Sequence, residues 1–419
     1  MEHADERSIP IPRRRRRPAL HWGEMAWLGL AIVVAGLAAY RAQLALSMYF
    51  AGSGDQPAGD LLRRWDEVRR WFAGQTVYGV LPDAIYPPAS YLLLWPLVGW
   101  LPAAGARLLF GGLELAGLAW LGVELLRLGR VAGARDRGLL AVSLVAFQAT
   151  AYAVAFGQLV LVLLPLLLWA AIAAGARPRR ASRTALVTIA AITALVKPTV
   201  AAPFVWLIVL AVGLPWAAAA VAGAYASLTL IAARFQPAGP SALALQWLDA
   251  AQRRTTTIGE ANVHTWARQL GAPGLGVAAS IAVLAWFCAW SFRHRADDRL
   301  FLAAVAALVA RLWAYHLSYD DLLLLVPMAW IHRTATASAA AGKPSRWARL
   351  GLGYCWLVLL APGAFALFPL TAETILEAAR DVMVAVLAAM LFALRDRARG
   401  TDEPTRVFAA RDDGGAERT

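Results

Sequence analysis

Acidic and basic side chains are concentrated in one short polar segment in the first quarter of the chain. Asp60 is followed closely by Arg63, Arg64, Asp66 and Glu67. A carboxylate can act as a general base, and arginines beside it can hold a phosphate through charge-assisted hydrogen bonds. The same spacing also suits a helix stabilised by ion pairs three and four residues apart. Spacing alone leaves both interpretations open.

This segment has the pattern of an amphipathic helix. Its apolar residues recur at helical spacing, and they are Leu61, Trp65, Val68 and Phe72. Asp60, Arg63, Arg64 and Glu67 fall on the other side of the predicted helix. Such a helix rests in the membrane interface, with tryptophan at headgroup depth and the charges facing water or a cavity.

Polar residues also interrupt the apolar stretches further along the chain. Gln158 follows Phe156 and Gly157, either as part of a site or to satisfy free backbone groups at a glycine hinge. Lys197 precedes Pro198 between two apolar segments. A lysine at bilayer depth is costly and is therefore a candidate site residue, although it can also extend to the interface.

A third polar cluster contains His316, Ser318, Tyr319, Asp320 and Asp321. A single histidine is more often structural, but a histidine, a tyrosine and two aspartates at one membrane face favour a functional role. A later loop carries Arg253, Arg254, His264, Trp266 and Arg268. These residues either bind phosphate or form a solvated surface, and the second interpretation is favoured.

The composition indicates that these residues belong to a membrane protein, whose helices position them. The chain has 419 residues, of which 60% are hydrophobic and 16% are charged, and its mean hydropathy is +0.55. These values exclude a soluble enzyme, a secreted disulfide scaffold and a disordered chain. Cys288 and Cys355 lie inside apolar stretches, so we expect no disulfide.

We predict an all-α, polytopic transmembrane bundle of about twelve spans, some of them tilted, broken or re-entrant. The spans lie near 25–48, 91–126, 138–155, 157–175, 184–197, 199–213, 216–233, 273–292, 300–315, 320–332, 348–367 and 380–396. The transmembrane domain covers 25–396. It is flanked by a basic tail, 1–24, and a disordered tail, 397–419.

The basic residues that give the chain its net charge of +13 are distributed in the way that determines membrane topology. Arginines cluster in alternate connections, which places both termini and both tails in the cytoplasm. Two long loops, 51–90 and 234–272, then lie outside. No histidine or cysteine spacing builds a metal site, and no phosphate-binding glycine motif is present, so we expect no metal and no cofactor.

Taken together and in order, these clusters resemble glycosyltransferase family 87 across about residues 25–330. These are membrane enzymes of the GT-C superfamily that use polyprenyl-phosphate sugars. The motifs that carry the resemblance are Asp60, Trp65, Gly74 to Tyr78, Tyr86-Pro87-Pro88, Phe156 to Gln158, Lys197-Pro198 and His316 to Asp320. Asp55, Asp66 and Glu67 lie near Asp60, and the distance to Gly74 favours Asp60 as the base.

The resemblance implies an inverting transfer at the extracytoplasmic face of a bacterial plasma membrane. Asp60 would be the general base, and His316 would orient the acceptor or assist with the phosphate. Lys197, Arg63 and Arg64 would bind the donor phosphate. Secondary or acceptor roles fall to Asp66, Glu67, Tyr78, Tyr86, Gln158, Tyr319 and Asp320. By family association the sugar is a hexose, and mannose is the first choice. The implied partners are a polyprenyl-phosphate sugar, a lipid or glycan acceptor and membrane lipids, with no nucleic acid.

Other classes of membrane protein compete with this hypothesis. A transporter or a lipid or lipid-sugar flippase would show internal repeats and polar residues near mid-depth. The two halves of the chain show no clear duplication, and the polar clusters gather at one face. An O-antigen ligase or polymerase would carry its large outer loop late in the chain. A purely structural protein would not need Asp60, Lys197 and His316 at one face.

Overall fold

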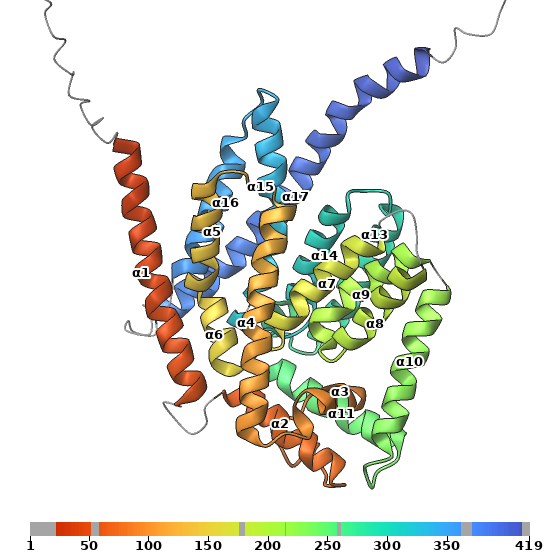
Figure 1. The fold of residues 1–419 in the computed structure, drawn as a ribbon. Helices are drawn as coiled ribbons and strands as arrows, with labels where there is room; N and C mark the ends of the chain where they lie inside the picture. The colour runs from red at the N-terminus through yellow and green to blue at the C-terminus, as the bar shows by residue number, and fades with distance from the viewer. Residues whose placement is uncertain are drawn as a thin grey trace, which may run out of the picture.

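A computed structural model describes residues 22–51, 58–175, 181–213, 215–257, 261–361 and 371–412. Within these ranges the chain is helical and contains no strand (Figure 1). The all-α prediction is therefore confirmed for the described part of the chain. Residues 1–21 of the predicted N-terminal tail, and Asp55, lie outside it.

Four described helices are long and apolar enough to cross a membrane. They are α1 (Trp22–Phe50), α4 (Ala103–Leu128), α10 (Trp216–Ala233) and α13 (Leu275–Arg293). α5 (Ala134–Ala146) and α6 (Gln148–Phe156) make a fifth candidate if their 48° bend lies within one span. The predicted total of about twelve spans is thus not established.

The long helices expose large apolar side chains. Val33 of α1, Leu108 of α4 and Ile281 of α13 are each more than 60% exposed. Apolar exposure of this extent along whole helices is unfavourable in water and favourable in hydrocarbon. The outer surface of the bundle is therefore that of a helical membrane protein.

Shorter apolar helices complete the bundle, and three of them form its centre. They are α7 (Val160–Ala174), α8 (Ala181–Ala194), α9 (Pro198–Val212) and α14 (Arg299–Trp313). α14 is buried along nearly its whole length and packs against α9 and α13. Three of them, α7, α9 and α14, are buried along most of their length and form the core, whereas α8 exposes Leu186 and Ile189.

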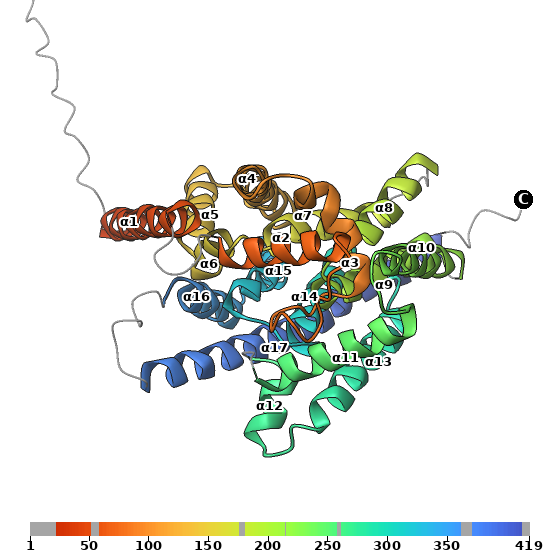
Figure 2. The same ribbon diagram turned by 90° about the horizontal axis from the view of Figure 1, so that it is seen from below.

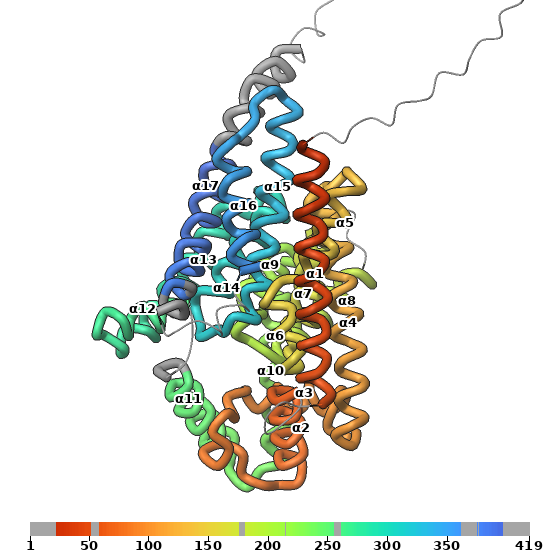
Figure 3. The backbone as a smooth tube through the Cα atoms, turned by 90° about the vertical axis from the view of Figure 1, so that its left-hand side faces the viewer, coloured from red at the N-terminus to blue at the C-terminus, as the bar shows by residue number. Residues whose placement is uncertain are grey.

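One end of the bundle is capped by helices from the two long loops (Figures 1 and 3). The first loop gives α2 (Gly59–Phe72), α3 (Pro88–Leu94) and the π-helical turn η1 (Trp95–Gly99). The second gives α11 (Pro240–Thr257) and α12 (Val263–Gln269). The helix predicted around Asp60 is confirmed as α2. Seen from this end, α2, α3 and α11 lie across the ends of the membrane helices (Figure 2).

The remaining elements are η2 (Ser318–Leu324), α15 (Leu325–Ala340), α16 (Arg346–Leu360) and α17 (Thr371–Asp412). α1 begins at the end of the bundle opposite α2, and α17 runs toward that same end (Figure 1). The backbone of α17 stays helical to Asp412. Residues 397–412, predicted as a disordered tail, lie within this helix.

Candidate functional site

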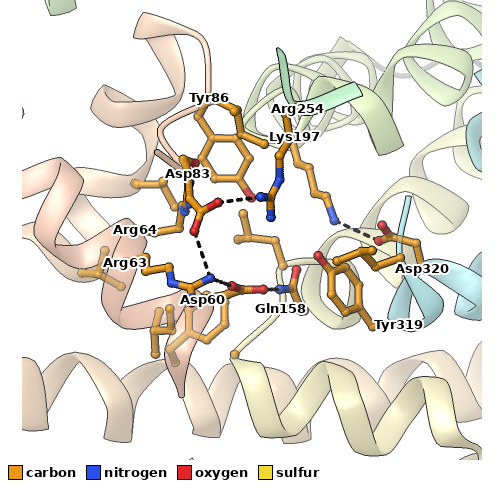
Figure 4. Close-up of a pocket in the computed structure, with 18 of the residues that line it drawn as sticks. Asp60, Arg63, Arg64, Asp83, Tyr86, Gln158, Lys197, Arg254, Tyr319 and Asp320 are labelled. Carbon is orange, nitrogen blue, oxygen red and sulfur yellow. Dashed lines mark hydrogen bonds and ion pairs between the residues drawn. The ribbon is translucent and has the colours of Figure 1, made fainter. Parts of the chain in front are cut away.

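A polar pocket lies between the capping helices and the ends of the core helices (Figure 4). Its charged and polar lining comes from α2, the loop before α3, the turn between α6 and α7, the start of α9, α11 and the connection between α14 and α15. These residues are Asp60, Arg63, Arg64, Asp83, Tyr86, Gln158, Lys197, Arg254, Tyr315, Tyr319 and Asp320. The enclosed space is about 50 Å³, so the pocket is nearly filled by its own side chains.

Asp60 lies in the first turn of α2 and is held by two donors. Its Oδ1 is 3.1 Å from Arg63 Nη1, and its Oδ2 accepts a hydrogen bond from the Gln158 side-chain amide. Gly157 has φ +71°, and a Cβ there would lie 2.5 Å from Leu61 Cβ. Only glycine therefore lets α2 approach the turn closely enough for Gln158 to reach Asp60.

A buried carboxyl supports this turn from the other side. Glu114 of α4 is fully buried and lies against the backbone of Gln158. Glu114 was not predicted as a site residue, because it is one acidic residue within a long apolar stretch. An ionisable residue in such a position is costly and usually marks a functional part of a membrane protein.

Asp83 connects the two outer loops. Its Oδ2 is 3.2 Å from Arg63 Nη1, and its Oδ1 is 2.8 Å from Arg254 Nη1 of α11. Trp247 of α11 also donates a hydrogen bond to the carbonyl of Ile85 at 2.9 Å. Sequence reasoning missed Asp83 and favoured a solvated surface for Arg254. Two features of the sequence could have indicated these residues: Asp83 lies just before the Tyr-Pro-Pro motif, and Arg254 follows another arginine.

Lys197, Asp320 and His316 form a buried chain of contacts. Lys197 precedes α9, and its Nζ lies 2.9 Å from Asp320 Oδ1 and 5.1 Å from the centre of the Tyr319 ring. Burial opposes ionisation of Asp320, but the charge of Lys197 and the hydrogen bonds from Lys197 and His316 hold the pKa of Asp320 well below its ordinary value. Asp320 is therefore an anion that fixes the lysine at the pocket wall.

His316 lies behind Asp320 and does not line the pocket. Its Nδ1 is 2.7 Å from Asp320 Oδ2, and burial lowers the pKa of His316. Because an ionised Asp320 can only accept, Nδ1 of a neutral His316 carries the proton. Nε2 is buried and has no hydrogen-bond partner among the described residues. The histidine predicted to be catalytic thus contacts Asp320 and not the pocket space.

Glu67 differs from its predicted place on the charged face of α2. It is 1% exposed, and its Oε2 accepts hydrogen bonds from Arg64 at 2.7 Å and from the Tyr91 hydroxyl at 3.4 Å. Burial raises the pKa of Glu67 to about 7, although the adjacent Arg64 lowers it. Helical spacing could not show this, because the side chain is covered by Tyr91 from α3, a separate element.

Arg64, which pairs with Glu67, lines the pocket. Its Nη2 donates a hydrogen bond to the carbonyl of Asp83 at 2.8 Å, and its guanidinium lies 4.7 Å from the centre of the Tyr86 ring. Asp66 and Tyr78 do not line the pocket. Asp66 pairs with Arg70 at 2.8 Å on the exposed side of α2, and the Tyr78 hydroxyl donates to the carbonyl of Tyr86 at 2.5 Å.

The charge of the pocket suits an anion. Four cationic side chains line it, namely Arg63, Arg64, Lys197 and Arg254, against three carboxylates, Asp60, Asp83 and Asp320. A phosphate would therefore meet several positive groups in a partly dry setting, where charge-assisted hydrogen bonds are strong. Among the residues that the structure describes, no three or more His, Cys, Asp or Glu side chains are grouped so as to hold a metal ion. No protein family, curated protein or solved structure matches the chain.

Proposed function

We propose that this protein is an integral membrane glycosyltransferase that uses a polyprenyl-phosphate sugar. It would move a hexose, with mannose as the first choice, to a lipid or glycan acceptor. The observation that carries the proposal is the position of Asp60. This carboxylate is aimed into a pocket with four cations, at one end of an apolar helical bundle. A general base and a phosphate-binding cluster are the two parts that such a transfer needs.

The proposed reaction is a single displacement at the anomeric carbon. Asp60 takes the proton of an acceptor hydroxyl, the hydroxyl oxygen forms a bond to the anomeric carbon, and the bond from that carbon to the phosphate oxygen breaks with inversion. Gln158 and Arg63 orient the carboxylate before the reaction. Orientation of this kind lowers the barrier because less ordering remains for the transition state.

The leaving lipid phosphate keeps its negative charge and needs cations near it. Lys197, Arg64 and Arg254 face the same pocket from three different elements. His316 acts in this scheme through Asp320, whose carboxylate sets the position of Lys197. We propose no metal in this scheme, since the arginines and the lysine supply the positive charge.

The wider setting is part of the same proposal. It comprises a GT-C-like bundle of about twelve spans in a bacterial plasma membrane, with both termini cytoplasmic and the pocket outside. The support is that the pocket lies at the capped end, whereas the arginine-rich connection from α4 to α5 and the connection from α15 to α16, which carries Lys343, lie at the other end (Figure 1).

Two observations favour a transporter or flippase as the second candidate. The pair α5 and α6 is bent by 48°, and Glu114 is a buried carboxyl within α4. Broken helices and intramembrane acids are common in proteins that move polar cargo across a bilayer.

A transfer assay separates the two candidates. The full chain in nanodiscs receives radiolabelled polyprenyl-phosphate-mannose and a bacterial lipid extract, and Asp60→Asn is tested beside it. We expect label on a new lipid with the wild-type protein and a loss of at least 100-fold with Asp60→Asn. Asp66→Asn is the matched control, because Asp66 lies on the same helix outside the pocket. Transfer that survives in Asp60→Asn would refute the base, and no transfer from any polyprenyl-phosphate sugar would favour the transporter.

A further inference from the structure

A second cavity lies at the end of the bundle away from Asp60, between α1, α4, α5, α15 and α16. Its volume is about 340 Å³, which falls in the range of roughly 300–1,000 Å³ typical of small-molecule sites. It shares no lining residue with the pocket around Asp60. Its walls are mostly apolar, with Leu30, Leu139, Met328 and Trp356 among them, and Asp136 and His332 are the ionisable residues that line it.

The polar groups of this cavity lie near the connection between α4 and α5, with His332 from α15 and Asp136 from the first turn of α5. The His332 ring Nδ1 lies 3.1 Å from the carbonyl of Gly129, and Arg137 Nε donates a hydrogen bond to the carbonyl of Val131 at 2.8 Å. Gly129, Val131 and His332 all line the cavity. This connection is therefore the polar rim of an otherwise hydrocarbon-like space.

Arg130 lies in this rim between two lining residues and has an unusual backbone. Its φ is +52°, a left-handed conformation that costs a residue with a Cβ roughly 1–2 kcal/mol. Arg130 is exposed, and within the described part of the chain no carboxylate pairs with it. Arg130 N donates to the carbonyl of Arg127 and Val131 N to that of Leu126, so this conformation closes the end of α4 as a Schellman-type cap.

The rim is also the most basic part of this end of α4 and α5. Arg127, Arg130, Arg135 and Arg137 fall within eleven residues. Among the residues that the structure describes, Arg127 pairs with Glu124 at 2.5 Å and Arg135 with Glu24 at 3.7 Å. Basic pockets between membrane helices at the cytoplasmic side bind the headgroups of anionic lipids.

We propose that this cavity binds one acyl chain of an anionic phospholipid from the leaflet at that end. The lipid phosphate then lies at the rim beside Arg130. The mostly apolar walls fit a hydrocarbon chain, while Arg130 and its neighbouring arginines outnumber Asp136 at the mouth and favour an anionic headgroup over a zwitterionic one. This inference is independent of the glycosyltransferase proposal, because it uses no residue of the pocket around Asp60.

Gly353 offers a way to fill the cavity without disturbing its walls. It lines the cavity from α16, and a Cβ added there has no heavy atom within 4 Å. Gly353→Leu should therefore occupy the space meant for the acyl chain. Gly36→Leu on α1 is the matched control, because Gly36 is also an exposed helical glycine with open space around its Cβ and does not line the cavity.

Arg130→Gly tests the headgroup contact. It removes the cation and relieves the backbone strain, since glycine adopts positive φ readily. Arg295→Gly is its control, because Arg295 is an exposed arginine in the connection between α13 and α14, helices that do not line this cavity.

The experiment uses the full chain in nanodiscs with photoactivatable phosphatidylglycerol, and cross-linked peptides are mapped by mass spectrometry. We expect labelling of cavity-lining peptides that falls at least tenfold in Gly353→Leu and severalfold in Arg130→Gly, with both controls unchanged. Photoactivatable phosphatidylcholine should label these peptides severalfold less. Labelling that is unchanged in Gly353→Leu would overturn the cavity assignment, and equal labelling by the two lipids would overturn the selection for anionic headgroups. If Gly353→Leu does not fold, the loss in Arg130→Gly and the ratio between the lipids still decide the outcome.

Discussion

At the scale of single residues, the orientation of Asp60 depends on Gln158 more than on Arg63. The Gln158 amide comes from a buried turn, whereas Arg63 is half exposed and is shared with Asp83. A donor on a long exposed side chain loses more conformational entropy when it is ordered, so its net contribution is smaller. The buried amide is therefore the group that keeps the carboxylate aimed into the pocket.

Gln158→Leu should lower kcat for sugar transfer by about 10- to 100-fold, since a hydrogen bond to a charged group contributes about 1.5–3 kcal/mol. The KM for the donor should change little, because Gln158 carries no charge that a phosphate could bind. Initial rates in nanodiscs measure both values. Gln75→Leu is the control, an exposed glutamine at the same end of the bundle. A large rise in donor KM with unchanged kcat would show that Gln158 binds substrate instead.

Glu67 makes the stability of α2 depend on pH. Burial raises the pKa of Glu67 from 4.5 to about 7 in the folded protein. Between these two values the folded state holds a proton that the unfolded state has lost, so stability falls as pH rises through this window. The apparent Tm should decrease from pH 4.5 to pH 7 and then level off. Glu67→Gln should remove the part of this slope that Glu67 contributes, and Asp66→Asn should keep it. An unchanged slope in Glu67→Gln would contradict the assignment.

At the scale of elements, the pocket depends on contact between two loops that are far apart in the sequence. α2 belongs to the first outer loop and α11 to the second, and Asp83 joins them through Arg63 and Arg254. The enclosed space of about 50 Å³ is too small for a sugar phosphate. If the pocket takes a sugar phosphate, we predict that the bridge between Asp83 and Arg254 loosens to admit it.

Asp83→Asn should lower the donor KM by up to about fivefold, because the partly exposed ion pair that opposes opening is worth up to ~1 kcal/mol. Arg254→Gln should raise the donor KM, because it removes a cation that lines the pocket. Asp249→Asn is the matched control, since Asp249 pairs with Arg253 on α11 and does not line the pocket. A rise in KM for both Asp83→Asn and Arg254→Gln would mean that the bridge holds the site together and does not close it.

The elements with a strong period were predictable from sequence, and the contacts between loops were not. The stripe through Leu61 and Val68 predicted α2, and long apolar runs predicted the membrane helices. α11 has no comparable apolar period, so the second loop was predicted without its helices. Asp83 is a single acidic residue beside prolines, and its role arises only from the approach of Arg254 in space.

The same limit applies within the site. The sequence placed Asp60, Gln158, Lys197 and Asp320 at one face, and the structure brings all four into one pocket. It could not distinguish residues that touch the pocket from those one layer behind. Whether a histidine faces a cavity or an aspartate depends on side-chain packing, which has no signature in spacing.

At the scale of the whole molecule, charge separates the two ends of the bundle. The capped end gathers the carboxylates and cations of the pocket, and the opposite end carries arginine-rich connections beside the apolar cavity. An arginine-rich end resists translocation across a membrane, so the capped end is predicted to face outward. A donor with a phosphate headgroup then reaches Asp60 without crossing the hydrocarbon core, where desolvation of its charge would be costly.

Cysteine labelling in intact cells tests this orientation directly. Single cysteines are introduced as Thr76→Cys before α3, Ser241→Cys in α11 and Lys343→Cys between α15 and α16, three exposed positions. The background carries Cys288→Ala, while the native Cys355 is buried. A membrane-impermeant maleimide should label the first two proteins in intact cells and Lys343→Cys only after lysis, because the charged reagent cannot cross the bilayer. Labelling of Lys343→Cys alone in intact cells would reverse the orientation, place Asp60 on the cytoplasmic side and remove the reason to expect an extracytoplasmic acceptor.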